Sequence, residues 1–158
     1  MPYRHDIITR DITEELLRSA VEYPVVTILG PRQSDKTTLA RMTFPDMPYF
    51  SLEDPDVRMA AEADPQGFLS RMENGGVLDE VQRLPVLLSY IQGMVDKTRK
   101  RGRFILTGGH QPQLHEAISQ SLAGRTGIRC ASAKALKFPM RKAVIIVQFP
   151  LRLHRWLA

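Results

Sequence analysis

The sequence is poor in cysteine and has no long apolar run. Its single cysteine, Cys130, cannot build a disulfide framework, and the N-terminal segment lacks the apolar core of a secretory signal. No window approaches the roughly 18 uncharged apolar residues that a membrane-spanning helix needs. These absences predict a cytoplasmic protein. A length of 158 residues with 43% hydrophobic residues predicts one globular core.

Acidic residues are absent from residues 128–158. All 17 Asp and Glu residues lie in residues 1–127, which hold 15 Lys and Arg residues and so carry a net charge of −2. Residues 128–158 hold the other 7 basic residues and carry +7. The overall charge of +5 is therefore a property of this tail. A basic tail suits nucleic acid or anionic lipid, but it can equally be basic without any partner.

Short apolar runs alternate with amphipathic segments along the chain. Their patterns predict strands at residues 25–29, 49–52, 77–78 and 103–107. They predict helices at residues 10–23, 36–41, 56–63, 65–73, 85–99 and 113–122. Asp11 and Glu14 are typical of a helix start, and Gly108 and Gly109 are expected to end the last strand. Strands that alternate with helices indicate a parallel α/β sheet.

Residues 30–37, GPRQSDKT, match the pattern G-x-x-x-x-G-K-[ST] except at its second glycine. In this motif, backbone N–H groups surround nucleotide phosphates at the N-terminus of a helix. Lys36 would contact the β- and γ-phosphates, and the Thr37 hydroxyl would bind Mg²⁺. The apolar strand before the segment and the helix after it favour this P-loop over a junction with an incidental Lys-Thr. The predicted nucleotide-binding residues are Gly30, Pro31, Arg32, Gln33, Ser34, Asp35, Lys36, Thr37 and Thr38.

Asp35 stands where the motif has its second glycine. A glycine there lets the backbone approach the phosphates without a Cβ atom. Asp adds bulk and a negative charge, and two unit charges ~4 Å apart at an effective dielectric of ~20 repel by about 4 kcal/mol. We therefore predict weak nucleotide binding. Folding should survive, because Asp suits the N-terminus of a helix.

An apolar strand that ends in two acidic residues follows the Gly75-Gly76 turn. This is the form of a Walker B element, although the same letters also occur at ordinary strand–helix junctions. Asp79 would hold Mg²⁺, and Glu80 would polarise the water that attacks the γ-phosphate, which favours an ATPase over a small-molecule kinase. Thr107 ends another strand, where ligands bind in parallel sheets, and is predicted to help place this water. The alternative is that Thr107 only caps the following turn.

Residues 4–127 closely resemble a group of prokaryotic AAA-like P-loop ATPases, in which a domain of unknown function follows the ATPase domain. The matching segments are TILGPRQSDKTTLAR, YFSLEDPDVR, GGVLDEVQRLPVLL, RFILTGGHQPQL and SLAGRTG. The resemblance implies an α/β fold, a parallel-sheet P-loop NTPase with an additional strand between the Walker A and Walker B strands. It implies ATP and Mg²⁺ as ligands and gives Lys36, Thr37, Asp79 and Glu80 the roles described above. It also implies that Arg125 senses phosphate or acts in trans, the alternative being a pair with a surface carboxylate.

The sequence departs from this family in three places. Asp35 replaces a glycine, Gly109 stands where a serine is expected, and the resemblance ends near Gly127. We therefore predict an ATPase domain at residues 1–127 that is incomplete at the C-terminus. Residues 128–158 would be an atypical basic tail from a reading-frame change, with the second domain absent. An unpaired sheet edge at this point would favour a homo-oligomer.

The predicted function is that of an ATP-binding protein of the AAA-like P-loop ATPase class. Its Mg-dependent ATP hydrolysis is expected to be impaired by Asp35 and by the truncation. The alternative is a non-catalytic remnant that binds nucleotide weakly or not at all. A third and weaker hypothesis is nucleic-acid binding through the basic tail.

Overall fold

Five parallel strands form the central sheet of the computed structural model, in the order β2-β3-β4-β1-β5. The structure describes residues 4–30, 36–98, 100–109, 111–122 and 126–127. The strands are β1 (Val25–Gly30), β2 (Tyr49–Ser51), β3 (Gly76–Asp79), β4 (Phe104–Gly109) and β5 (Thr126–Gly127). The predicted α/β class is therefore confirmed. The additional strand is confirmed too, because β4 lies between β1, which precedes the predicted P-loop segment, and β3, which ends in the predicted Walker B residue Asp79.

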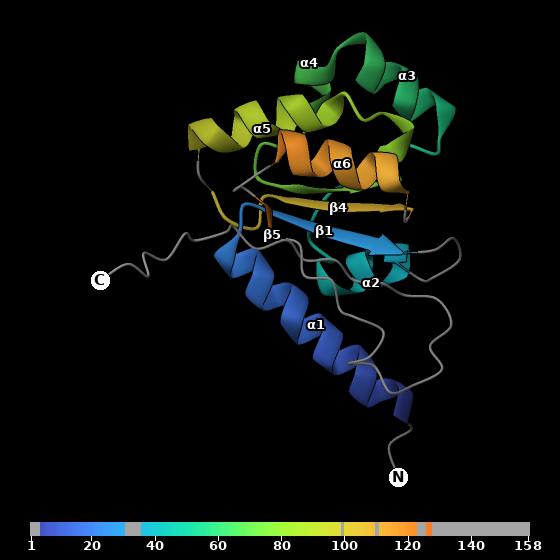
Figure 1. Ribbon diagram of the computed structural model, residues 1–158, viewed down its shortest axis with the longest axis vertical. Coiled ribbons are helices and arrows are strands. Elements are labelled where there is room, and N and C mark those ends of the chain that lie inside the picture. The colour runs from blue at the N-terminus through green and yellow to red at the C-terminus, as the bar shows by residue number, and fades with distance from the viewer. Residues whose placement is uncertain (1–3, 31–35, 99, 110, 123–125, 128–158) are drawn as a thin grey trace.

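Helices cover both faces of this sheet, as Figure 1 shows. One face carries α1 (Arg4–Glu22) and α2 (Lys36–Thr43). The other face carries α3 (Pro55–Ala63), α4 (Pro65–Ser70), α5 (Leu87–Thr98) and α6 (Pro112–Ser121). A short 3-10 helix, η1 (Val81–Arg83), follows β3 directly. The sheet is therefore the middle layer of three.

Each face of the sheet contributes to its own apolar cluster. Val25 and Leu29 of β1 belong to the cluster under α3–α6, whereas Val26 and Ile28 belong to the cluster under α1 and α2. All six residues of β1 are buried. A strand covered on both faces reads as a continuous apolar run, which is why this segment was recognisable as a central parallel strand.

Most of the predicted elements are present, but several ends differ. Helix α1 begins at Arg4, so Asp11 and Glu14 lie inside it rather than at its start. Residues 4–10 contain no Pro or Gly to interrupt a helix. Strand β4 continues through Gly108 and Gly109, which pair in register with the last two residues of β1. Helix α5 begins at Leu87, after η1, instead of at residue 85.

The last described strand, β5, lies beside β1. Thr126 and Gly127 pair in parallel with Val25 and Val26. A two-residue strand thus begins directly after residue 125 and occupies the sheet position beside β1. Residues 128–158, with the predicted tail and its frame change, lie outside the described residues. Within the described part of the chain, no helix combines the length and the apolar character needed to cross a membrane.

The turn before β3 depends on a glycine. Gly75 has φ +120°, and a Cβ atom there would lie 2.7 Å from the backbone oxygen of Arg103. We expect Gly75→Ala to lower the free energy of unfolding by about 2–4 kcal/mol, because it adds backbone strain to a clash with a backbone atom. Urea unfolding monitored by circular dichroism measures this change.

Gly93 is the matched control for this substitution. It lies on the exposed side of α5, and a Cβ atom there would meet nothing within 4 Å. Gly93→Ala should therefore stabilise the chain by about 0.5–1 kcal/mol through helix propensity. Equal effects of the two substitutions would contradict the role assigned to the Gly75 turn.

Candidate functional site

Four strand ends meet along one edge of the sheet. Gly30 ends β1 beside Gly109 at the end of β4, and Asp79 ends β3 beside Ser51 at the end of β2. Because the strands are parallel, their carboxyl ends share this edge, which is where ligands bind in open α/β sheets. The P-loop segment leaves the same edge from Gly30, and α2 begins after it at Lys36.

Asp79 is the centre of the polar contacts at this edge. The residue is buried, with 4% of its surface exposed. The Thr37 hydroxyl donates to Asp79 Oδ2 at 2.8 Å, the Tyr49 hydroxyl donates to the same oxygen at 2.6 Å, and the Thr107 hydroxyl donates to Oδ1. A buried carboxylate needs such partners. Here α2, β2 and β4 each supply one, so Asp79 links three elements to β3.

Tyr49 was not among the predicted site residues. Burial first, and then its hydrogen bond to Asp79 and the charge of that carboxylate, raise the pKa of Tyr49 to about 12. The hydroxyl therefore stays protonated at neutral pH and remains a donor to Asp79. Arg41 Cζ lies 5.0 Å from the centre of the Tyr49 ring. The sequence signal was slight, namely an aromatic residue at the start of the predicted strand at residues 49–52.

Glu80 has a left-handed backbone conformation, with φ 59° and ψ 46°. Within the described ranges it is the only residue other than glycine with a positive φ. This conformation costs a non-glycine residue roughly 1–2 kcal/mol, and such strain gathers at functional sites. The Glu80 N–H donates to Thr107 Oγ1 at 3.3 Å. Thr107 thus contacts both acidic residues, although β4 continues two residues beyond it to Gly109 instead of ending at Thr107 as predicted.

The remaining predicted residues divide into two groups. Lys36 is buried at the start of α2, whereas Thr38 is exposed in the same turn. A second group falls outside the described residues, and its predicted roles stay predictions. That group consists of Pro31, Arg32, Gln33, Ser34, Asp35 and Arg125.

A cavity lies beside two of the residues that contact Asp79. A cavity of about 480 Å³ is lined by residues of α2, the segment after it, β2 and β3, and both Thr37 and Tyr49 contribute to its wall. Two of the residues that donate to Asp79 therefore line this cavity, whereas Asp79 itself does not. Hydroxyl and carboxylate oxygens are the ligands that Mg²⁺ prefers, so Thr37 and Asp79 fit this ion chemically.

Strand β1 leads into the P-loop segment, β4 lies beside it, and Asp79 at the end of β3 contacts Thr37. This arrangement is that of a P-loop nucleotide-binding fold. The chain belongs to the AAA domain family, whose family model matches residues 22–138. It therefore carries a nucleotide-binding domain of the P-loop ATPase type. The match extends beyond Gly127, the point near which the resemblance was expected to end.

Two curated mycobacterial proteins are similar to this chain. They are uncharacterized proteins of Mycobacterium bovis and Mycobacterium tuberculosis, and each is 38% identical to it over 118 residues. The aligned segment covers 73% of this chain but only 26% of either relative. The chain thus spans about a quarter of the length of these relatives.

Proposed function

We propose that the chain binds Mg-ATP at its P-loop and is an ATPase whose hydrolysis is impaired by Asp35. The contact between Thr37 and Asp79 is the observation that supports this proposal most directly. These residues are 42 positions apart, yet the hydroxyl and the carboxylate lie 2.8 Å from each other. They come from the two motifs whose side chains hold Mg²⁺ in P-loop NTPases.

Each residue of the edge would have a distinct role. Lys36 would neutralise charge on the β- and γ-phosphates, while Thr37 and Asp79 would hold Mg²⁺, which when bound stabilises charge on the phosphate oxygens. Glu80 would accept a proton from the attacking water. Thr107, in contact with Asp79 and next to the Glu80 backbone, would help to place that water.

Arg125 is proposed to sense phosphate or to act in trans, on the resemblance alone. The alternative proposal for Arg125 is an ion pair with a surface carboxylate. Truncation to alanine would separate them, because loss of a phosphate contact lowers the hydrolysis rate and loss of a surface ion pair changes little.

The alternative function is that of a non-catalytic remnant. Asp35 favours it, because a carboxylate inside a phosphate-binding loop opposes the ligand. In that case the Asp79 contacts would serve only to hold α2, β2 and β4 together. The two functions differ in whether bound nucleotide is hydrolysed, because the remnant would bind nucleotide weakly or not at all and would not hydrolyse it.

A titration with Mg-ATP, monitored by calorimetry, tests the nucleotide binding that the proposal requires. We expect measurable but weak binding that Lys36→Met lowers by about 10- to 100-fold, because a charge-assisted contact contributes roughly 1.5–3 kcal/mol. Lys97→Met is the control, since Lys97 is exposed in the last turn of α5. Binding that is absent, or that both variants lower equally, would support the remnant instead.

A further inference from the structure

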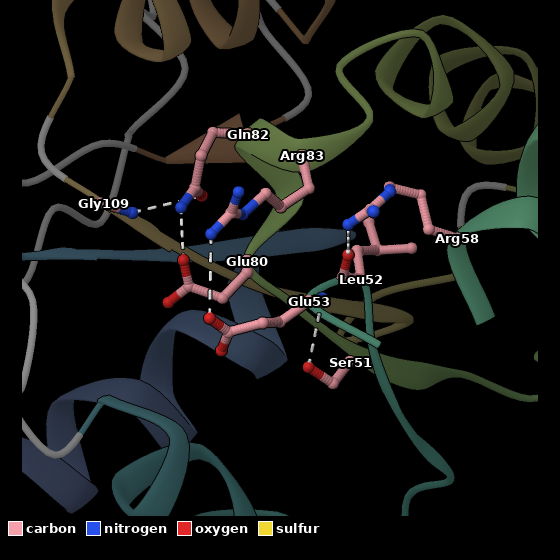
Figure 2. A network of polar contacts seen from close by, with 8 residues as sticks. All are labelled: Ser51, Leu52, Glu53, Arg58, Glu80, Gln82, Arg83 and Gly109. Atoms are coloured by element: carbon pink, nitrogen blue, oxygen red, sulfur yellow. Dashed lines mark hydrogen bonds and ion pairs between the residues drawn. The ribbon is translucent and has the colours of Figure 1, made fainter. Parts of the chain in front are cut away.

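The side chain of Gln82 connects Glu80 to the end of β4. Gln82 is the middle residue of η1, and its Nε2 donates to Glu80 Oε2. At its other side, Gln82 Oε1 accepts the backbone N–H of Gly109 at 3.2 Å. Figure 2 shows the amide of Gln82 between the Glu80 carboxylate and Gly109. No role predicted from the sequence includes this residue.

Chemistry at both ends determines which way this amide points. The Gly109 N–H can only donate, so it requires the carbonyl oxygen of the amide. The amide nitrogen must then face Glu80, whose carboxylate can only accept while it is ionised. The two contacts therefore support each other, and a flipped amide would lose both.

The surrounding backbone leaves room for this bridge. A Cβ atom at Gly108 would lie 2.8 Å from Gln82 Oε1 and 2.6 Å from a methyl carbon of Leu114. The glycine at this position thus allows the Gln82 side chain to lie across the end of β4. Gly109 is paired in register with Gly30, the first residue of the P-loop segment. The bridge consequently joins Glu80 to the strand end next to the P-loop.

We propose that Gln82 is a positioning residue for Glu80. By holding Oε2, its amide restricts the Glu80 side chain and leaves Oε1 to accept the proton of the attacking water. A glutamate side chain has several rotatable bonds, and the left-handed backbone of Glu80 fixes only where that side chain starts. The inference rests on the proposed function, because a base needs positioning only if the chain hydrolyses ATP.

Gln82→Met tests this role, because methionine has a similar length but neither donates to Glu80 nor accepts strongly from Gly109. The parent for this test carries Asp35→Gly, which is expected to bind Mg-ATP more tightly than the unmodified chain. In this parent, we expect Gln82→Met to lower kcat about 10- to 100-fold while the affinity for Mg-ATP stays within about 2-fold. Misplacing a catalytic group affects the reaction more than binding. Arg83→Met is the control, because Arg83 belongs to the same η1 helix but pairs with the exposed Glu53. Its kcat should be unchanged.

A double substitution separates positioning from a general structural effect. In a Glu80→Gln background, Gln82→Met should lower single-turnover hydrolysis by less than about 2-fold, because the base that Gln82 positions is already gone. A structural role would lower the rate by the same factor in both backgrounds. Equal factors, or a full kcat in the single variant, would overturn the inference.

Nuclear magnetic resonance tests the bridge without relying on hydrolysis. The side-chain amide resonances of Gln82, identified by their loss in Gln82→Met, should move in Glu80→Gln, and the Gly109 N–H resonance should move in Gln82→Met. If neither moves, the inference is wrong even when the parent hydrolyses ATP. A parent that binds Mg-ATP without hydrolysing it would overturn the proposed ATPase activity. If the Gln82 and Gly109 resonances still move in that case, Gln82 has a structural role only.

Discussion

Replacing Asp35 with glycine should raise the affinity of the chain for Mg-ATP about a hundredfold. A carboxylate ~4 Å from the phosphates would repel them by about 4 kcal/mol at an effective dielectric of ~20, and its Cβ atom would add roughly 1–2 kcal/mol if the loop needs a positive φ. Half of this total corresponds to about two orders of magnitude in the dissociation constant. Isothermal titration of both forms with Mg-ATP measures the difference.

Asp35→Asn separates the two causes of this effect. Asparagine keeps the shape of aspartate and removes its charge, so it should recover the electrostatic part of the affinity and leave the backbone part unchanged. Higher salt should also narrow the difference in affinity between the unmodified chain and the Asp35→Asn variant, because screening weakens repulsion. A sub-micromolar dissociation constant for the unmodified chain would show that Asp35 does not harm binding.

Replacing Glu80 with glutamine should lower kcat about 10²- to 10⁴-fold in the Asp35→Gly parent, with the affinity for Mg-ATP nearly unchanged. Glutamine keeps the size of the side chain but cannot accept a proton from water at neutral pH. The base acts on the attacking water rather than on the bound nucleotide, so the loss belongs to the reaction step. Single-turnover hydrolysis together with calorimetric binding measures both quantities.

Glu53→Gln is the matched control for Glu80→Gln. Glu53 is an exposed carboxylate that pairs with Arg83 of η1 at 3.7 Å. Its replacement removes the same charge from the segment that follows β2 without removing a hydrogen bond to Asp79, and exposed pairs contribute little. An unchanged rate in Glu80→Gln would remove Glu80 from the mechanism, whereas equal losses in both variants would point to a general effect of charge.

Patterns within short stretches of sequence were enough to predict the class of fold and several of the residues that meet at the carboxyl edge of the sheet. The apolar run at Val25–Gly30, followed by the P-loop segment, was enough to predict a buried parallel strand and the helix after it. Thr37 and Asp79 were assigned to one Mg²⁺ site from their motifs, and the structure brings them together. Such features depend on the spacing of residues along the chain, so they can be read without knowing the fold.

The partners of these residues were decided only by the tertiary structure. Tyr49 reaches Asp79 across 30 positions because β2 pairs with β3, and Gln82 reaches Gly109 across 27 positions because η1 lies at the end of β4. Glu80, with its left-handed backbone, likewise forms hydrogen bonds with Thr107 and Gln82. No local pattern specifies such pairs, because strand order and long-range packing choose which side chains meet at the edge of the sheet.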